Sequence, residues 1–112
     1  MQPKPIGHYS LSVRAGDLLF LSGQISEDTA ADIAKQTEQV LKNIEAILAS
    51  QNLAKESVVK MTIFLTDFSQ FSKVNEIYAR FFGDHKPARS TVEVSKLPKG
   101  AAVEIEAIAT FF

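Results

Sequence analysis

Two charged side chains in the C-terminal quarter of the chain are the strongest candidates for chemistry. Arg89 stands near the start of a predicted strand, just after Pro87, and a guanidinium binds a carboxylate or phosphate through two hydrogen bonds and keeps its charge. Glu104 lies on the last predicted strand, where a carboxylate in a partly dry site can have a raised pKa and act as an acid or base. The alternative for Arg89 is a surface ion pair with Glu93 or Glu106. The alternative for Glu104 is a solvated strand face that also carries Glu106.

Four further residues are weaker candidates, each with a structural alternative. Tyr9 precedes the first predicted strand and is typical of a packing residue with a wet hydroxyl. Ser22 and Gly23 follow a buried strand, where they offer backbone N–H groups to an anion or form a bulge. Asn75 is the polar member of an apolar helix patch and bonds either a strand backbone or a ligand.

Composition excludes several classes of site. The 112 residues include no cysteine, which removes disulfides and thiolate nucleophiles, and His8 and His85 lie too far apart for a ligand motif, so we expect no metal. The net charge is −1 with scattered lysines, which argues against dedicated nucleic-acid binding. No apolar segment reaches the ~18 residues needed to span a bilayer, and no signal peptide is evident. We therefore expect a cytoplasmic protein without a membrane association.

Strands and helices alternate along the chain in the order β-β-α-β-α-β-β. Short-period patterns predict strands over 9–15, 18–21, 58–65, 87–95 and 103–111, and helical spacing predicts apolar stripes over 33–48 and 71–82. Thr29 with Asp32, and Asp67 with Gln70, resemble caps for the two helices. The pattern predicts one α+β domain over residues 1–112 with both helices on one sheet face.

The other face of this sheet would still carry apolar residues such as Phe64 and Ile108. An exposed apolar face of this kind needs a partner. A chain of this length also gains a deep pocket most readily between subunits. Both arguments favour an oligomer.

The sequence resembles the Rid family, also called RidA or YjgF, along nearly its whole length. The matching segments occur in the family's order, and the block from Pro87 onward is the most specific. They are 6–10 (Ile-Gly-His-Tyr-Ser), 22–25 (Ser-Gly-Gln-Ile), 74–75 (Val-Asn), Tyr78 with 81–82 (Phe-Phe), 87–90 (Pro-Ala-Arg-Ser), 92–94 (Val-Glu-Val), 97–100 (Leu-Pro-Lys-Gly) and 103–109 (Val-Glu-Ile-Glu-Ala-Ile-Ala).

This resemblance implies a chorismate-mutase-like fold and a homotrimer with three sites in the clefts between subunits. It implies hydrolytic deamination of reactive enamines and imines, such as 2-aminoacrylate, to 2-oxo acids and ammonia, without a cofactor. Arg89 matches the arginine that grips the substrate carboxylate, and Glu104 matches the glutamate that orients the attacking water. Tyr9, Ser22, Gly23, Asn75 and the residue at Thr91 match positions lining the cleft.

The sequence departs from the family pattern around this cleft. Thr91 stands where many deaminases of the family have cysteine, so a thiol contribution is absent, although a hydroxyl can still donate a hydrogen bond. His8 replaces a common proline and Leu11 a common glutamine, and the loops over 26–30 and 85–87 are shortened. These changes bear on substrate range more than on chemistry. The alternative functions are a non-catalytic trimer that binds small carboxylates for regulation and, on weaker grounds, RNA cleavage or translation inhibition.

Overall fold

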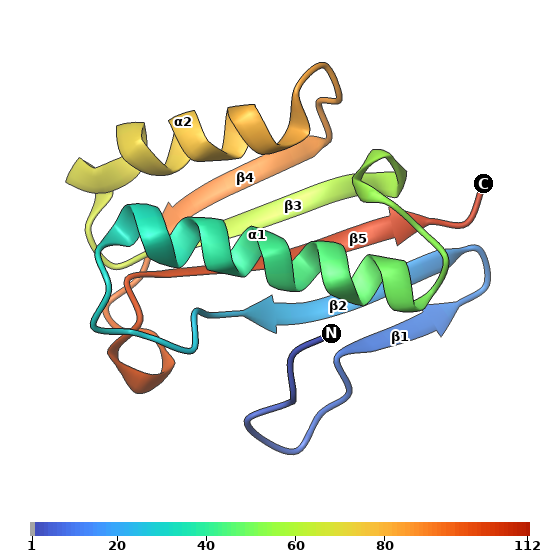
Figure 1. The fold of residues 1–112 in the computed structure, drawn as a ribbon, viewed down its shortest axis with the longest axis horizontal. Coiled ribbons are helices and arrows are strands. Elements are labelled where there is room, and N and C mark those ends of the chain that lie inside the picture. The colour runs from blue at the N-terminus through green and yellow to red at the C-terminus, as the bar shows by residue number, and fades with distance from the viewer. Residues whose placement is uncertain (1) are drawn as a thin grey trace.

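The computed structural model describes residues 2–112 and consists of one five-stranded sheet with two helices across one face (Figure 1). This arrangement confirms the predicted α+β fold and its order of elements. The elements are β1 (Ser12–Ala15), β2 (Leu18–Gln24), α1 (Ile33–Ser50), β3 (Val58–Leu65), α2 (Phe71–Phe82), β4 (Ala88–Glu93) and β5 (Val103–Thr110), with short 3₁₀ turns before β3, α2 and β5.

The strands lie in the order β1-β2-β5-β3-β4, so the last strand of the chain occupies the middle of the sheet. β5 is antiparallel to both β2 and β3, whereas β3 and β4 run parallel and are connected through α2. A parallel pair needs a crossover connection of this kind. The topology therefore places β5 between the β1–β2 hairpin and the β3–α2–β4 unit, and β5 contributes side chains to both faces of the sheet.

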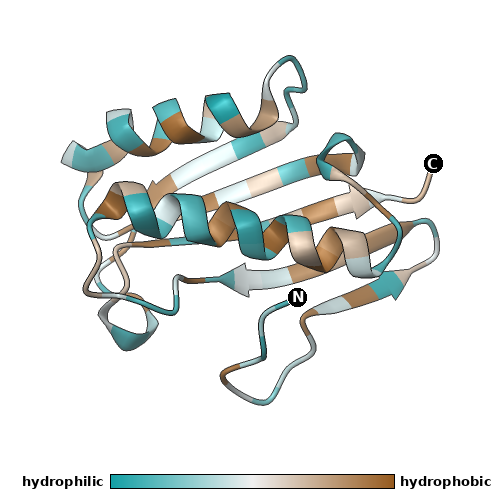
Figure 2. Cartoon of the chain, viewed as in Figure 1, coloured by the Kyte–Doolittle hydropathy of each residue, from teal (hydrophilic) through white to brown (hydrophobic). Residues whose placement is uncertain are grey.

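Strand alternation separates a covered face from an open face. On β5, residues 103, 105, 107 and 109 are buried under the helices, whereas Glu104, Glu106 and Ile108 point away from them. Polar and apolar residues also alternate turn by turn along both helices, whose apolar sides contribute to the core (Figure 2). The open face keeps exposed aromatic surface, with Phe20 43% exposed, and Phe64 and Ile108 are half-buried on it, as predicted.

The turn and cap signals are confirmed in most places. Gly16 has a φ of 61° in the two-residue hairpin between β1 and β2, and Asn52 takes a φ of 59° just after α1. The predicted cap at Thr29 is wrong: Asp32 caps α1 by accepting from the backbone N–H of Lys35 at 2.9 Å. Asp28 organises the preceding turn instead, because its carboxylate accepts from the Ala30 N–H.

Strand ends and the second cap differ from prediction by a few residues. β1 begins at Ser12 rather than residue 9, because the chain around Tyr9 folds into a tight turn in which the Tyr9 N–H donates to the Gly7 carbonyl. Asp67 caps a 3₁₀ turn over Phe68–Gln70, and α2 begins only after that turn. No helix in the described part of the chain is both long and apolar enough to span a membrane.

Candidate active site

A bulge at the end of β2 brings Gly23 against Glu104. Leu21 pairs with Ala107 and Gln24 with Ile105, so β2 holds one residue more than β5 between these pairs. A Cβ built on Gly23 would overlap the Glu104 carboxylate and lie 2.9 Å from its Cδ and 3.2 Å from its Cγ. The absence of a side chain at Gly23 therefore creates the space in which the carboxylate lies. The predicted bulge is confirmed, and close packing explains the glycine.

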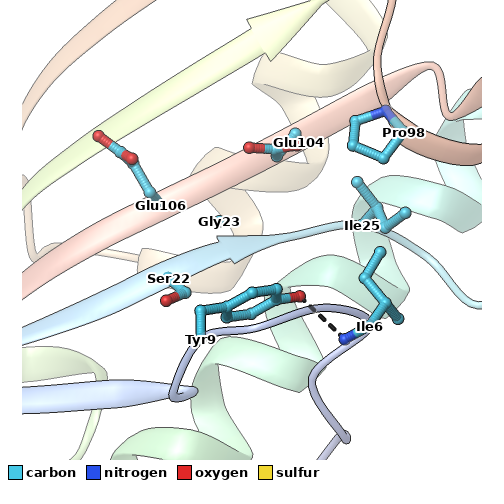
Figure 3. Close-up of a pocket in the computed structure, with 8 residues that line it drawn as sticks. All are labelled: Ile6, Tyr9, Ser22, Gly23, Ile25, Pro98, Glu104 and Glu106. Atoms are coloured by element: carbon cyan, nitrogen blue, oxygen red, sulfur yellow. Dashed lines mark hydrogen bonds between the residues drawn. The ribbon is translucent and has the colours of Figure 1, made fainter.

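Glu104 forms part of a pocket of about 530 Å³ on the open face of the sheet. Ser22, Gly23 and Glu106 lie toward one end of the pocket, and three aliphatic side chains, Ile6, Ile25 and Pro98, lie toward the other (Figure 3). The Tyr9 ring lies between the two ends and completes the lining.

Local hydrogen bonds hold the outer wall of this pocket. The Ile6 N–H donates to the Tyr9 hydroxyl at 3.1 Å, which closes the loop over residues 6–9 (Figure 3). The Ser22 hydroxyl donates to the Ser10 carbonyl at 2.7 Å, and the Ser22 N–H donates to the Leu11 carbonyl at 2.9 Å. The segment carrying Tyr9 is thus fastened to the bulge that carries Gly23, which fixes Tyr9 relative to Glu104.

The environment of Glu104 favours its protonated form. Partial burial raises the pKa of the Glu104 carboxyl above its ordinary value, and the like charge of Glu106, two residues along the same face, raises the pKa further. A carboxyl group with a raised pKa exchanges protons more readily near neutral pH than an exposed one does. The pocket therefore holds a carboxyl suited to orienting water and transferring a proton.

Arg89 lies in a second cluster, where α2 holds its guanidinium from one side. Arg89 Nη1 donates to Asn75 Oδ1 at 2.8 Å, and its Cζ lies 4.8 Å from the ring centre of Tyr78 and 5.6 Å from that of Phe71. Positions 71, 75 and 78 share one stripe of a helix. A charge-assisted hydrogen bond and two aromatic faces orient the guanidinium, and we refer to this group as the Arg89 cradle.

Two hydroxyl groups at the cradle are buried without a partner among residues 2–112. They are the Tyr78 hydroxyl and Thr91 Oγ1. Burial raises the pKa of the Tyr78 hydroxyl, and the Arg89 charge opposes that rise. The cradle therefore includes polar atoms whose hydrogen-bonding capacity is unused within one copy of the chain.

The Arg89 cradle and the Glu104 pocket belong to opposite faces of the sheet. Arg89 pairs with Met61, a buried residue of the covered face, whereas Glu104 pairs with Phe64 on the open face. The structure thus brings Tyr9, Ser22, Gly23 and Glu104 together in one pocket, and brings Asn75 and Thr91 to Arg89 in the other cluster. One copy of the chain does not join these two sets.

Several neighbours of the site were not identified as functional from the sequence. The sequence pattern places Phe71 and Tyr78 in the apolar stripe of the second helix, and it does not indicate a site role for Ile6, Ile25 or Pro98. The spacing of Phe71 and Tyr78 around Asn75 was the available signal, because residues three and four apart share a helix face. The aliphatic residues carried no such signal, since single apolar residues in loops are common.

Comparison with known proteins assigns the family. Residues 1–111 match the family model described as Endoribonuclease L-PSP. A RutC family protein of Pyrococcus horikoshii is 50% identical over 113 residues, covering 96% of this chain and 90% of the relative. Among solved structures, the Rid family protein YyfA of Yersinia pestis is 51% identical with a TM-score of 0.91, covering 97% of this chain and 92% of that one. The structure of Escherichia coli TdcF with bound serine is 39% identical with a TM-score of 0.91, covering 97% and 92%. The chain therefore belongs to the L-PSP family, which comprises the RutC and Rid proteins.

Proposed function

We propose that this protein hydrolyses reactive enamines and imines derived from amino acids, such as 2-aminoacrylate, to 2-oxo acids and ammonia. The enamine first tautomerises to the imine, R–C(=NH)–COO⁻. Water then adds to the imine carbon, a proton passes to the nitrogen, and the C–N bond breaks to leave R–C(=O)–COO⁻ and NH₃. The substrate is labile, so that positioning and electrostatic stabilisation suffice for catalysis.

The observation that carries this proposal is the Glu104 carboxyl held over Gly23 in a partly dry pocket. Its raised pKa suits it to orient the attacking water, accept a proton from it and return that proton to the leaving nitrogen. Ser22 and Tyr9 line the same pocket and offer hydroxyl groups to the substrate. No group with a stronger claim to acid–base chemistry lines this pocket among residues 2–112.

Arg89 supplies the complementary function of binding the substrate carboxylate. The Asn75 and Tyr78 contacts fix the guanidinium, which favours recognition of a planar carboxylate. Serine, the molecule bound in the related TdcF structure, is a small carboxylated amino acid. Its presence in a relative supports a carboxylate ligand for this chain.

We propose further that the complete site forms between copies of the chain in a homotrimer. The Arg89 cradle and the Glu104 pocket face opposite ways in one copy, so a substrate contacting both must lie between two copies. The open face also leaves Phe20 43% exposed and Val13 56% exposed, and such apolar surface favours association. In a ring, each cradle meets the pocket of the next copy, and every subunit takes part in two sites.

The direct test is imine hydrolysis by the purified protein. An amino-acid oxidase generates the imine, and release of ammonia and 2-oxo acid is followed against the spontaneous rate. We expect acceleration by the wild-type protein and its loss in Arg89→Ala, with Arg80→Ala, an exposed arginine on the outer side of α2, as the matched control. The absence of acceleration with every imine in a broad panel would refute the proposal.

Three other functions are the alternatives to imine hydrolysis. A carboxylate-binding trimer without turnover predicts that 2-oxo acids bind tightly while no imine is hydrolysed faster. RNA cleavage is suggested by the family description Endoribonuclease L-PSP, and translation inhibition by the name of a Vibrio vulnificus structure 43% identical to this chain. The pocket instead contains two glutamates and no basic residue among those lining it, which disfavours binding of a polyanion.

A further inference from the structure

We propose that the aliphatic wall of the Glu104 pocket binds the substrate side chain and makes the protein selective for imines of medium-sized aliphatic amino acids over those of small or acidic ones. This inference rests on the proposed function and concerns its substrate range. The wall consists of Ile6, Ile25 and Pro98. We refer to it below as the aliphatic wall.

The pocket has an apolar end and a polar end, with Glu104 between them. Glu104 lies between the aliphatic wall at one end and Ser22 and Glu106 at the other (Figure 3). A substrate whose imine carbon lies beside the Glu104 carboxyl therefore has apolar surface available on one side only. A hydrocarbon side chain placed there leaves water, which is favourable in proportion to the area removed.

The wall is built to remain in place and open to a ligand. Ile25 is half-buried, and its carbonyl accepts from Asn43 Nδ2 of α1 at 3.4 Å. Ile6 is 51% exposed although its N–H is bonded to the Tyr9 hydroxyl. An isoleucine anchored by its backbone and exposed at its side chain offers apolar contact area without needing to reorganise.

The negative charge of the pocket should also discriminate against substrates with acidic side chains. Glu104 and Glu106 both line the pocket, and a substrate with a carboxylate side chain would bring a further negative charge close to them. Like charges brought together in a partly dry site repel each other. The pocket should therefore reject acidic side chains more strongly than neutral polar ones of the same shape.

The expected selectivity follows from the number of buried carbons. Each fully buried methylene contributes about a factor of four, so the three extra carbons of a leucine side chain relative to alanine would give about sixtyfold if fully enclosed. Because the pocket is open on one side, we expect about a tenfold higher kcat/KM for the leucine-derived imine. The asparagine-derived imine should fall near alanine, and the aspartate-derived imine about tenfold lower still.

The test compares imines of alanine, leucine, asparagine and aspartate, each normalised to its spontaneous hydrolysis. Leucine, asparagine and aspartate have side chains of similar shape, so they separate apolar contact from polarity and charge. Binding of pyruvate and 4-methyl-2-oxopentanoate is measured in parallel by calorimetry, which reports the side-chain preference even if no imine is turned over. The leucine-type ligand should bind more tightly by several fold.

Variants assign the preference to the wall. Ile6→Ala and Ile25→Ala should each lower the ratio of kcat/KM for the leucine-derived imine to that for the alanine-derived imine by about threefold. Val59→Ala, at an exposed aliphatic residue near the start of β3 that does not line the pocket, is the matched control and should leave the ratio unchanged.

Three results would overturn this inference. The first is equal kcat/KM for the alanine- and leucine-derived imines with equal binding of the two 2-oxo acids. The second is a wild-type ratio retained in both Ile6→Ala and Ile25→Ala. The third is a loss of oligomer stability in these variants with selectivity unchanged, which would mean that a neighbouring copy covers the wall. Failure of the proposed function gives a different result, because then no imine is accelerated whatever its side chain.

Discussion

Replacing Gly23 by alanine tests whether Glu104 must lie where the structure places it. The new Cβ would lie 2.9 Å from the Glu104 Cδ, whereas carbon atoms in contact are separated by about 3.5–4.0 Å. The carboxyl group must therefore retreat by roughly 1 Å. A displacement of that size at a reacting group costs about a hundredfold in rate. We expect kcat for imine hydrolysis to fall by about that factor.

The same substitution should leave the fold and the carboxylate anchor intact. Gly23 is absent from the glycines with positive φ, so alanine fits its backbone and the free energy of unfolding should change by less than about 1 kcal/mol. KM should change little, because Arg89 lies in the other cluster. Steady-state kinetics and urea denaturation measure both quantities.

A double variant provides the control for this reasoning. Glu104→Asp shortens the side chain by one methylene and withdraws it from the new Cβ. The combined loss in Gly23→Ala/Glu104→Asp should therefore be smaller than the product of the two single losses. Wild-type kcat in Gly23→Ala, or strictly multiplicative losses in the double variant, would refute the positional argument.

The remaining predictions concern Glu104 and the Arg89 cradle. The pKa of Glu104 is raised in the folded protein, so this carboxyl binds a proton more tightly in the folded than in the unfolded protein. Ionising Glu104 therefore lowers the free energy of unfolding. Glu104→Gln should therefore increase the free energy of unfolding at pH 7, and this increase should vanish as the pH falls below the ordinary pKa of glutamate near 4.5. Urea denaturation at several pH values measures the increase. An increase that does not depend on pH would contradict the prediction. Tyr78→Phe removes a buried hydroxyl that has no hydrogen-bond partner within one copy, and it keeps the ring beside Arg89. Denaturation should therefore show that the free energy of unfolding increases by about 1 kcal/mol. A comparable decrease would mean that the hydroxyl forms a hydrogen bond in the assembled protein. Asn75→Ala removes the 2.8 Å bond that orients Arg89; KM should rise about tenfold with kcat retained, and an unchanged KM would show that the bond is dispensable.

Most of the fold could be predicted from the sequence because strand alternation, turns and helix ends each depend on a few neighbouring residues. The β5 alternation identified both the buried side chains and the outward-facing glutamates. Gly16 and Asn52 were predicted because their positive φ is specific to a few residue types. The bulge at Ser22 and Gly23 was predicted because a glycine within a strand indicates a bulge or a close approach of another group. The Thr29 cap was wrong because several polar residues in one loop compete to begin a helix, and only the side-chain geometry shows that Asp32 accepts the bond.

The arrangement of the site was less predictable because it depends on register between distant segments. Arg89 and Asn75 are 14 residues apart, and their contact requires the rotation of α2 over the sheet. The placement of Arg89 and Glu104 on opposite faces follows from the β3–β4 and β3–β5 registers. A shift of either register by one residue would reverse the face of every side chain on that strand.

Mixing two inactive variants tests most directly the claim that the Arg89 cradle of one copy completes the Glu104 pocket of another. Arg89→Ala retains an intact Glu104 pocket, and Glu104→Gln retains an intact Arg89 cradle, so each variant alone should be inactive in imine hydrolysis. When the two are unfolded together in equal amounts and refolded into mixed trimers, about one interface in four should pair two intact halves. We predict recovery of about a quarter of the wild-type rate, proportional to the fraction of mixed trimers. Mixed trimers without activity, or either variant fully active alone, would contradict a shared site.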